Sequence, residues 1–165
     1  MIEPISLDEA KQYIRIDADD NFDDRVIQTI ITGQRLNMER QLSIWLVNRT
    51  VTENYRRACC GMIYPEPFSL KYGPVVGDVV IKDTSGNNIS VDNVGSSEWP
   101  VFILPTNADI TYNAGYDCLP DDLRLALLQN IATAYENREN STTESVNEVV
   151  NTTRKLSQPY SRNVF

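Results

Sequence analysis

The feature that most constrains the fold of this chain is a proline-punctuated, strand-like stretch between two segments with helical periodicity. Apolar and polar residues alternate in short runs over residues 50–113, and prolines interrupt the runs at positions 65, 67, 74, 100 and 105. Such alternation is typical of half-buried strands, and proline keeps strands short because it has no N–H to donate. The pattern predicts an α+β protein: a mainly α-helical bundle of three main helices, a β-rich insertion between the second and third long helices, and an extended C-terminal tail.

The two helices expected before the insertion cover about residues 6–15 and 22–45. Ser6 followed by Glu9 is a capping box, in which the serine hydroxyl accepts a hydrogen bond from the first helical turn. In the second helix, apolar residues recur every three or four positions and form one face. Arg35 and Glu39 are expected on the opposite, exposed side. Gly33 either permits another helix to approach closely or has no packing role.

The third long helix is expected over about residues 121–139. Pro120 precedes it, and Asp121 and Asp122 near its start are favoured by the helix dipole. Besides its main apolar stripe, this helix has further apolar residues on a second face. A helix that is apolar on two sides is either buried on both or covered by a partner. We expect packing between copies of the chain at the second face, through Leu125, Leu128 and Ala132.

The insertion and the tail complete the expected organisation. The clearest hairpin turn lies at Thr84–Asn87, and further strands are expected at about residues 50–58, 68–72, 101–104 and 109–112. Residues 1–140 are expected to form one domain. Residues 141–165 are rich in Asn, Ser and Thr, so we expect a flexible C-terminal tail, either disordered or folded against a neighbour.

Composition narrows the classes of function. The net charge is −8, which disfavours a basic face that grips nucleic acid. The chain has no histidine, the commonest general base and metal ligand. Its three cysteines, Cys59, Cys60 and Cys118, lack metal-ligand spacing and are expected to be reduced packing residues. We expect no cofactor, no metal, no catalytic residue and no membrane association, and a cytosolic site of synthesis.

Five acidic residues gather between the first two helices: Asp17, Asp19, Asp20, Asp23 and Asp24. Asp17, Asp19 and Asn21 match the first ligands of an EF-hand calcium loop. Phe22 stands where that loop needs glycine, and Gln28 where it needs glutamate, so a standard calcium loop is excluded. Two interpretations remain: a solvated joint between helices, or a negative ridge that faces DNA or a basic patch on a partner.

Several motifs, taken in order, resemble one family. L-D-E-A-K-Q-Y-I-R-I-D (residues 7–17) is followed by D-D-x-x-I-x-x-x-I (residues 23–31), then by I-T-Y-N-A-G-Y (residues 110–116), P-D-D-L-R-L-A-L-L (residues 120–128) and Y-E-N-R-E (residues 135–139). The set, spread over about residues 5–140, resembles the head–tail connector family of long-tailed bacteriophages, also called adaptor or head-completion proteins.

The resemblance implies a non-enzymatic virion protein in the neck between head and tail. Such proteins form a ring, commonly a dodecamer, beneath the portal protein. The ring extends the DNA channel without binding DNA specifically and supports a stopper or tail-completion protein. The acidic residues between the first two helices would then face the channel. Docking to the portal would fall to the C-terminal segment, at Val149, Val150, Leu156, Pro159 and Tyr160.

Two alternatives stay open. One is another neck component, a stopper or tail-terminator, for which strand content well above helix content is expected. The other is a metal-dependent hydrolase that uses the carboxylates of Asp17–Asp24.

Overall fold

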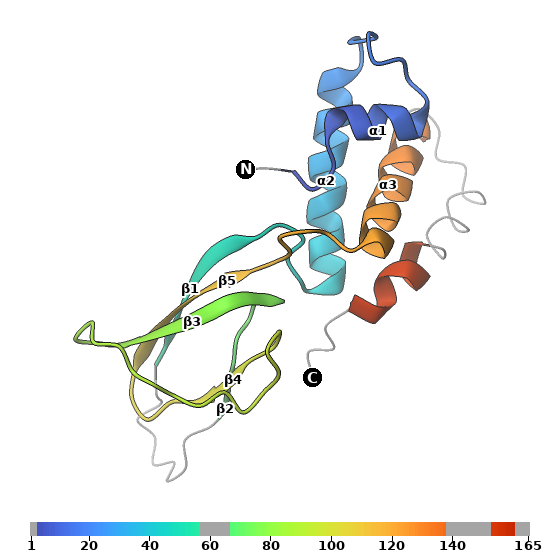
Figure 1. Cartoon of the computed structure of the whole chain (residues 1–165). Helices are drawn as coiled ribbons and strands as arrows, with labels where there is room; N and C mark the ends of the chain where they lie inside the picture. Colours follow the sequence, from blue (N-terminus) through green and yellow to red (C-terminus); the bar gives the residue numbers. More distant parts are fainter. Residues whose placement is uncertain (1–2, 57–66, 138–152, 161–165) are drawn as a thin grey trace. The chain divides into compact units, whose positions relative to one another are not determined.

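The computed structural model describes residues 3–56, 67–137 and 153–160, and the chain divides into two compact units (Figure 1). The first, the helical unit, combines Met1–Leu46 with Cys118–Phe165, and the second, the sheet unit, is Val47–Asp117. Helices hold 38% of the described residues and strands 23%. The predicted fold class is therefore wrong: the described residues form four helices and two antiparallel sheets, not a three-helix bundle with a β insertion. The strand region has a hydrophobic core of its own, which makes it a separate compact unit and not an insertion into a helical bundle.

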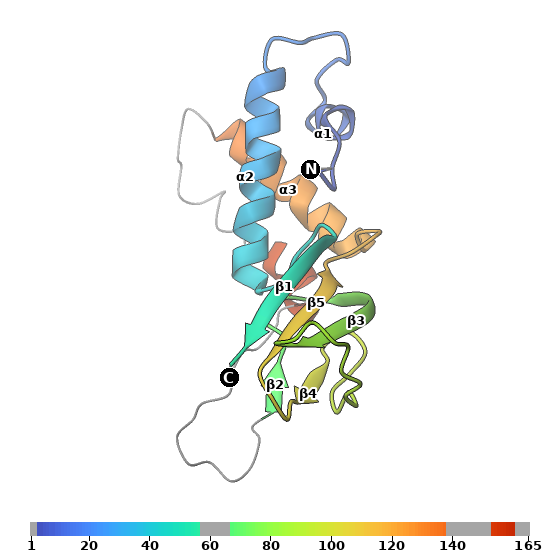
Figure 2. The same cartoon turned by 90° about the vertical axis from the view of Figure 1, so that its left-hand side faces the viewer.

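Three of the helices make up most of the helical unit. They are α1 (Leu7–Ile14), α2 (Asp24–Leu42) and α3 (Asp121–Glu136). Figures 1 and 2 show α2 and α3 side by side, with α1 packed near both. The fourth is a short helix at residues 153–157, which continues into a 3₁₀ turn at Gln158–Tyr160.

Local signals set the helix ends. The Ser6 hydroxyl accepts a hydrogen bond from the Glu9 N–H at 3.2 Å, which satisfies one of the free donors of the first turn. The predicted Ser6 cap is confirmed. At the other ends, Arg15 and Ser43 adopt left-handed backbone conformations, with φ of 64° and 56°, and stop α1 and α2.

The core of the helical unit is built from the apolar stripes of its helices. The side chains on these stripes are almost completely removed from water, as expected from their spacing of three and four residues. From α2 and α3 they include Ile27, Ile31, Met38, Leu123, Leu127 and Ile131.

Two charged residues of α2 lie in this interior. Arg35 is 3% exposed and Glu39 is 9% exposed, so the expectation that they mark the exposed side of α2 is wrong. Arg35 Nη1 donates to Glu39 Oε2 at 2.9 Å, and Arg35 Nε donates to Glu3 Oε2 at 2.6 Å. Glu39 Oε1 accepts from the Leu46 N–H at 3.2 Å. Pairing of this kind is what permits charged groups to be buried.

The sheet unit contains a three-stranded and a two-stranded antiparallel sheet. β1 (Arg49–Tyr55), β5 (Ala108–Ala114) and β3 (Val75–Asp83) form the larger sheet with β5 in the centre, which Figure 2 shows. β2 (Pro67–Ser69) pairs with β4 (Val101–Ile103). Every second residue of β5 is buried, so Ala108, Ile110, Tyr112 and Ala114 face the core of this unit.

The predicted turn at Thr84–Asn87 follows β3. The Asp83 N–H donates to the Asn87 carbonyl at 2.9 Å, and the Ile89 N–H donates to the Ile81 carbonyl at 2.8 Å. The chain therefore reverses where expected. Its returning arm pairs through an isolated bridge between Lys82 and Asn88 rather than as a full strand.

Candidate functional site

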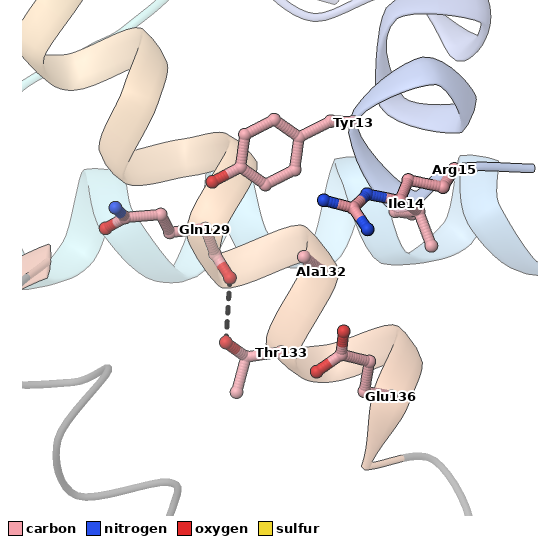
Figure 3. Close-up of a pocket in the computed structure, with 7 residues that line it drawn as sticks. All are labelled: Tyr13, Ile14, Arg15, Gln129, Ala132, Thr133 and Glu136. Carbon is pink, nitrogen blue, oxygen red and sulfur yellow. Dashed lines mark hydrogen bonds between the residues drawn. The ribbon is translucent and has the colours of Figure 1, made fainter.

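An open groove lies on the helical unit where the end of α1 meets the C-terminal half of α3. Its volume is about 530 Å³. Figure 3 shows Tyr13 and Arg15 extending from the end of α1 toward the α3 side chains. Thr133 Oγ1 donates to the Gln129 backbone carbonyl at 2.8 Å, one turn earlier on α3. The lining residues, here called the α1–α3 groove, are Tyr13, Ile14, Arg15, Gln129, Ala132, Thr133 and Glu136.

The loop between α1 and α2 carries the predicted acidic cluster, and the structure gives its members different roles. Asp23 accepts a hydrogen bond from the Tyr135 hydroxyl, and Asp24 accepts one from Lys11 Nζ at 2.8 Å. Lys11 is 2% exposed, so Asp24 neutralises a buried ammonium group. Asp17, Asp19 and Asp20 are exposed. Asp23 and Asp24 therefore hold the loop in place, whereas Asp17, Asp19 and Asp20 face solvent.

The same loop presents an aromatic side chain that the sequence reasoning placed at the start of a helix. Phe22 is 92% exposed. Its backbone N–H donates to Asp20 Oδ1 at 3.1 Å, and the helix begins only at Asp24. The sequence signal for this exposure is that Phe22 is the only large apolar residue in the acidic segment 17–24, so it has no large apolar sequence neighbour to pack against.

The three residues predicted to pack between copies fall in different environments. Leu125 is 40% exposed, whereas Leu128 is 8% exposed and belongs to the core of the helical unit. Ala132 is partly buried and lines the α1–α3 groove. The second face of α3 is therefore apolar, but only part of it is open to a partner.

The C-terminal residues predicted to dock on a portal are partly described. Leu156 lies on the short helix and is partly buried, while Pro159 is exposed and Tyr160 partly buried in the 3₁₀ turn that follows. Val149 and Val150 lie outside the described residues.

Within the described residues, no three side chains of the types His, Cys, Asp and Glu are grouped so as to hold a metal ion. Every helix among the described residues is too short or too polar to cross a membrane. The features that stand out chemically are surfaces: an acidic loop with an exposed ring, a groove, and an exposed leucine on α3.

The structure defines an α+β chain in which both ends of the sequence build a helical unit and the middle builds a sheet unit. No protein-family model and no curated protein sequence matches it. Solved structures share the fold.

A chain from a structure described as the neck of an empty gene transfer agent (GTA) particle, computed with C6 symmetry, matches with a TM-score of 0.74 and 16% sequence identity. The match covers 98% of this chain and 92% of that one. A chain of the virion of the native gene transfer agent particle matches with a TM-score of 0.69 and 17% identity, over 98% and 91% of the two chains. A chain of the native particle's neck, computed with C12 symmetry, gives 0.64 and 16%, over 100% and 94%.

Proposed function

We propose that this protein is a structural component of the neck of a phage or phage-like particle, where copies form a ring that joins the head to the tail. The observation that supports this most strongly is the fold likeness to neck chains of gene transfer agent particles, which extends over nearly the whole length of both chains. The resemblance of the sequence motifs to head–tail connectors points to the same place by an independent route.

The proposed assembly is a dodecamer beneath the portal protein that extends the DNA channel and supports a stopper or tail-completion protein. C6 and C12 symmetry in the similar necks is consistent with a ring of repeated chains. The acidic charge suits a conduit, because a surface that repels phosphate does not retain DNA that must pass. The exposed acids Asp17 and Asp20 are proposed to contribute to this channel surface.

Two surfaces are proposed for protein partners. Leu125 and Ala132 on α3 offer apolar area to a neighbouring copy, and the segment of Leu156, Pro159 and Tyr160 offers a short ordered element to the portal. The chemistry required is packing alone, so no catalytic step is assigned.

Between the candidate neck roles, the composition of the fold favours a connector. Helices exceed strands among the described residues, 38% against 23%, whereas the stopper and tail-terminator alternative was expected to be dominated by strands. For the hydrolase alternative, Asp23 and Asp24 are already engaged by Tyr135 and Lys11, which supports structural roles for those two carboxylates.

The experiment is deletion of the gene from a strain that produces the particles, followed by electron microscopy. We expect DNA-filled heads without tails, and restoration of joined particles by the wild-type gene. A Leu125→Asp variant should restore few joined particles, whereas Val94→Asp, at a residue that is 61% exposed in the sheet unit, should restore them. Particles that join tails normally without the gene would rule out the proposed function.

A further inference from the structure

Phe22 is more exposed than any other large apolar side chain of the described residues. Its exposed fraction is 92%, against 61% for Val94, the next in order. The loop that carries it is anchored at both ends, because Lys11 Nζ donates to the Ala18 carbonyl at 3.1 Å and to Asp24, and Tyr135 donates to Asp23. The described residues therefore leave the ring in water, and a partner that covers it would bury this apolar surface.

The α1–α3 groove contains a charged group that has no partner among the described residues. The Arg15 guanidinium is exposed and makes no ion pair or hydrogen bond within the described part of the chain. A cation without a partner beside a groove favours an acidic ligand, although the lining also holds one acid, Glu136. Tyr13, 39% exposed, and Ala132 add apolar surface beside them.

We infer that the Phe22 loop (residues 16–23) of one copy docks in the α1–α3 groove of the next copy. The inference rests on the proposed function, since a ring made from one kind of chain needs two different, complementary surfaces on every copy. The helical unit carries such a pair: an acidic loop with an exposed ring, and a groove with an unpaired arginine.

The contacts follow from the chemistry of the two surfaces. The Phe22 ring packs on Tyr13 and Ala132, and the exposed Asp19 carboxylate pairs with Arg15. Although the loop begins directly after Arg15, Phe22 stays exposed in the copy that bears it, so the groove is left for a neighbour.

The first test measures ring assembly of the full-length chain by sedimentation velocity and mass photometry over a range of concentrations. Phe22→Ser should raise the dissociation constant for self-association roughly 30-fold or more, the scale of an interface hot spot. Val94→Ser is the matched control, because it removes an exposed apolar side chain from the sheet unit, and it should assemble like the wild type. Circular dichroism melting should show both variants folded.

The second test exchanges the charges. Arg15→Glu and Asp19→Arg should each weaken assembly, and the double variant should recover most of the wild-type association because the pair is re-formed with opposite polarity. Recovery identifies these two residues as partners, and a mixture of the two single variants that assembles better than either variant alone places the pair across copies.

Three outcomes would overturn the inference. The first is that Phe22→Ser self-associates as tightly as the wild type, and the second is that the double variant assembles no better than the single variants. The third is that the wild-type chain stays monomeric at millimolar concentration. Each is distinguishable from failure of the proposed function, which is scored by tail joining in the deletion strain. If Phe22→Ser forms normal rings but the particles fail to join tails, Phe22 contacts a different neck protein and not a neighbouring copy of this chain.

Discussion

Arg35 and Glu39 lie one turn apart on α2 and form an ion pair of 2.9 Å inside the helical unit. Burial alone would lower the pKa of Arg35, but the hydrogen bond to Glu3 and the charges of Glu39 and Glu3 outweigh it and raise the pKa. Glu39 also accepts from the Leu46 N–H, where the chain leaves the helical unit. The pair thus balances two buried charges and holds the segment that follows α2 through the Leu46 N–H.

Replacing Glu39 should destabilise the protein strongly. Glu39→Leu removes a carboxylate that pairs with the buried guanidinium of Arg35, and it also removes the acceptor of the Leu46 N–H. We therefore expect a loss of about 3 kcal/mol or more in the free energy of unfolding. The measurement is urea denaturation. Arg35→Met combined with Glu39→Leu is the control, because removing both charges should cost clearly less than removing one. A double variant as unstable as the single one would contradict this account.

Ser6→Ala tests the start of α1. The Ser6 hydroxyl accepts from the Glu9 N–H, and its loss should cost about 1 kcal/mol of stability. Ser6→Asp, which restores an acceptor, should recover most of that loss. Thermal unfolding of the three proteins gives the comparison, and an unchanged midpoint for Ser6→Ala would show that the cap is dispensable.

The same helix start shows how far the sequence predicts contacts. The Ser6 cap follows from residues three positions apart and was predictable. The destination of the Glu9 side chain was not: its carboxylate accepts two hydrogen bonds of 2.6 Å from Arg124, which is 115 residues away in sequence. Local patterns constrain hydrogen bonds within a turn, whereas pairing between helices depends on how the chain packs.

The periodicity of apolar residues likewise predicted only part of the burial pattern on α2 and α3. It identified the buried stripe correctly, but it assigned Arg35 and Glu39 to water because charge alone suggests exposure. It also grouped Leu125 with Leu128, although only Leu125 stays open. The partition of the chain into two units could not be predicted either, since it depends on long-range pairing of β1 and β3 with β5.

Gly33→Ala should stabilise the protein. Gly33 lies within α2, and a Cβ built there meets no atom of another element within 4 Å. The suggestion that this glycine allows close approach of another helix therefore finds no support within the described residues. Alanine is favoured over glycine in a helix interior by about 1 kcal/mol, and we expect a gain of that order in urea denaturation. Gly115→Ala is the contrasting variant: it should destabilise the protein, because φ at this position is 113° and the added Cβ would clash with the Val47 carbonyl oxygen.

Asp83 should titrate below the usual range for an aspartate. Its carboxylate accepts hydrogen bonds from the backbone N–H groups of Asn87 and Ser85, both at 2.8 Å. The bond from Asn87 contributes most to lowering the pKa of Asp83 from its ordinary value of 3.8. A folded-state pKa below the unfolded one means that the stabilisation is complete above the unfolded value and is lost as the pH falls through the folded one.

NMR titration of the Asp83 carboxyl carbon measures this directly, and the amide protons of Ser85 and Asn87 should shift over the same acidic range. Asp83→Asn is the control, because its neutral amide oxygen still accepts a hydrogen bond but does not titrate there. In that variant the Ser85 and Asn87 amide signals should no longer follow the acidic transition. If they shift in Asp83→Asn as they do in the wild type, another carboxylate controls the turn and the assignment to Asp83 is wrong.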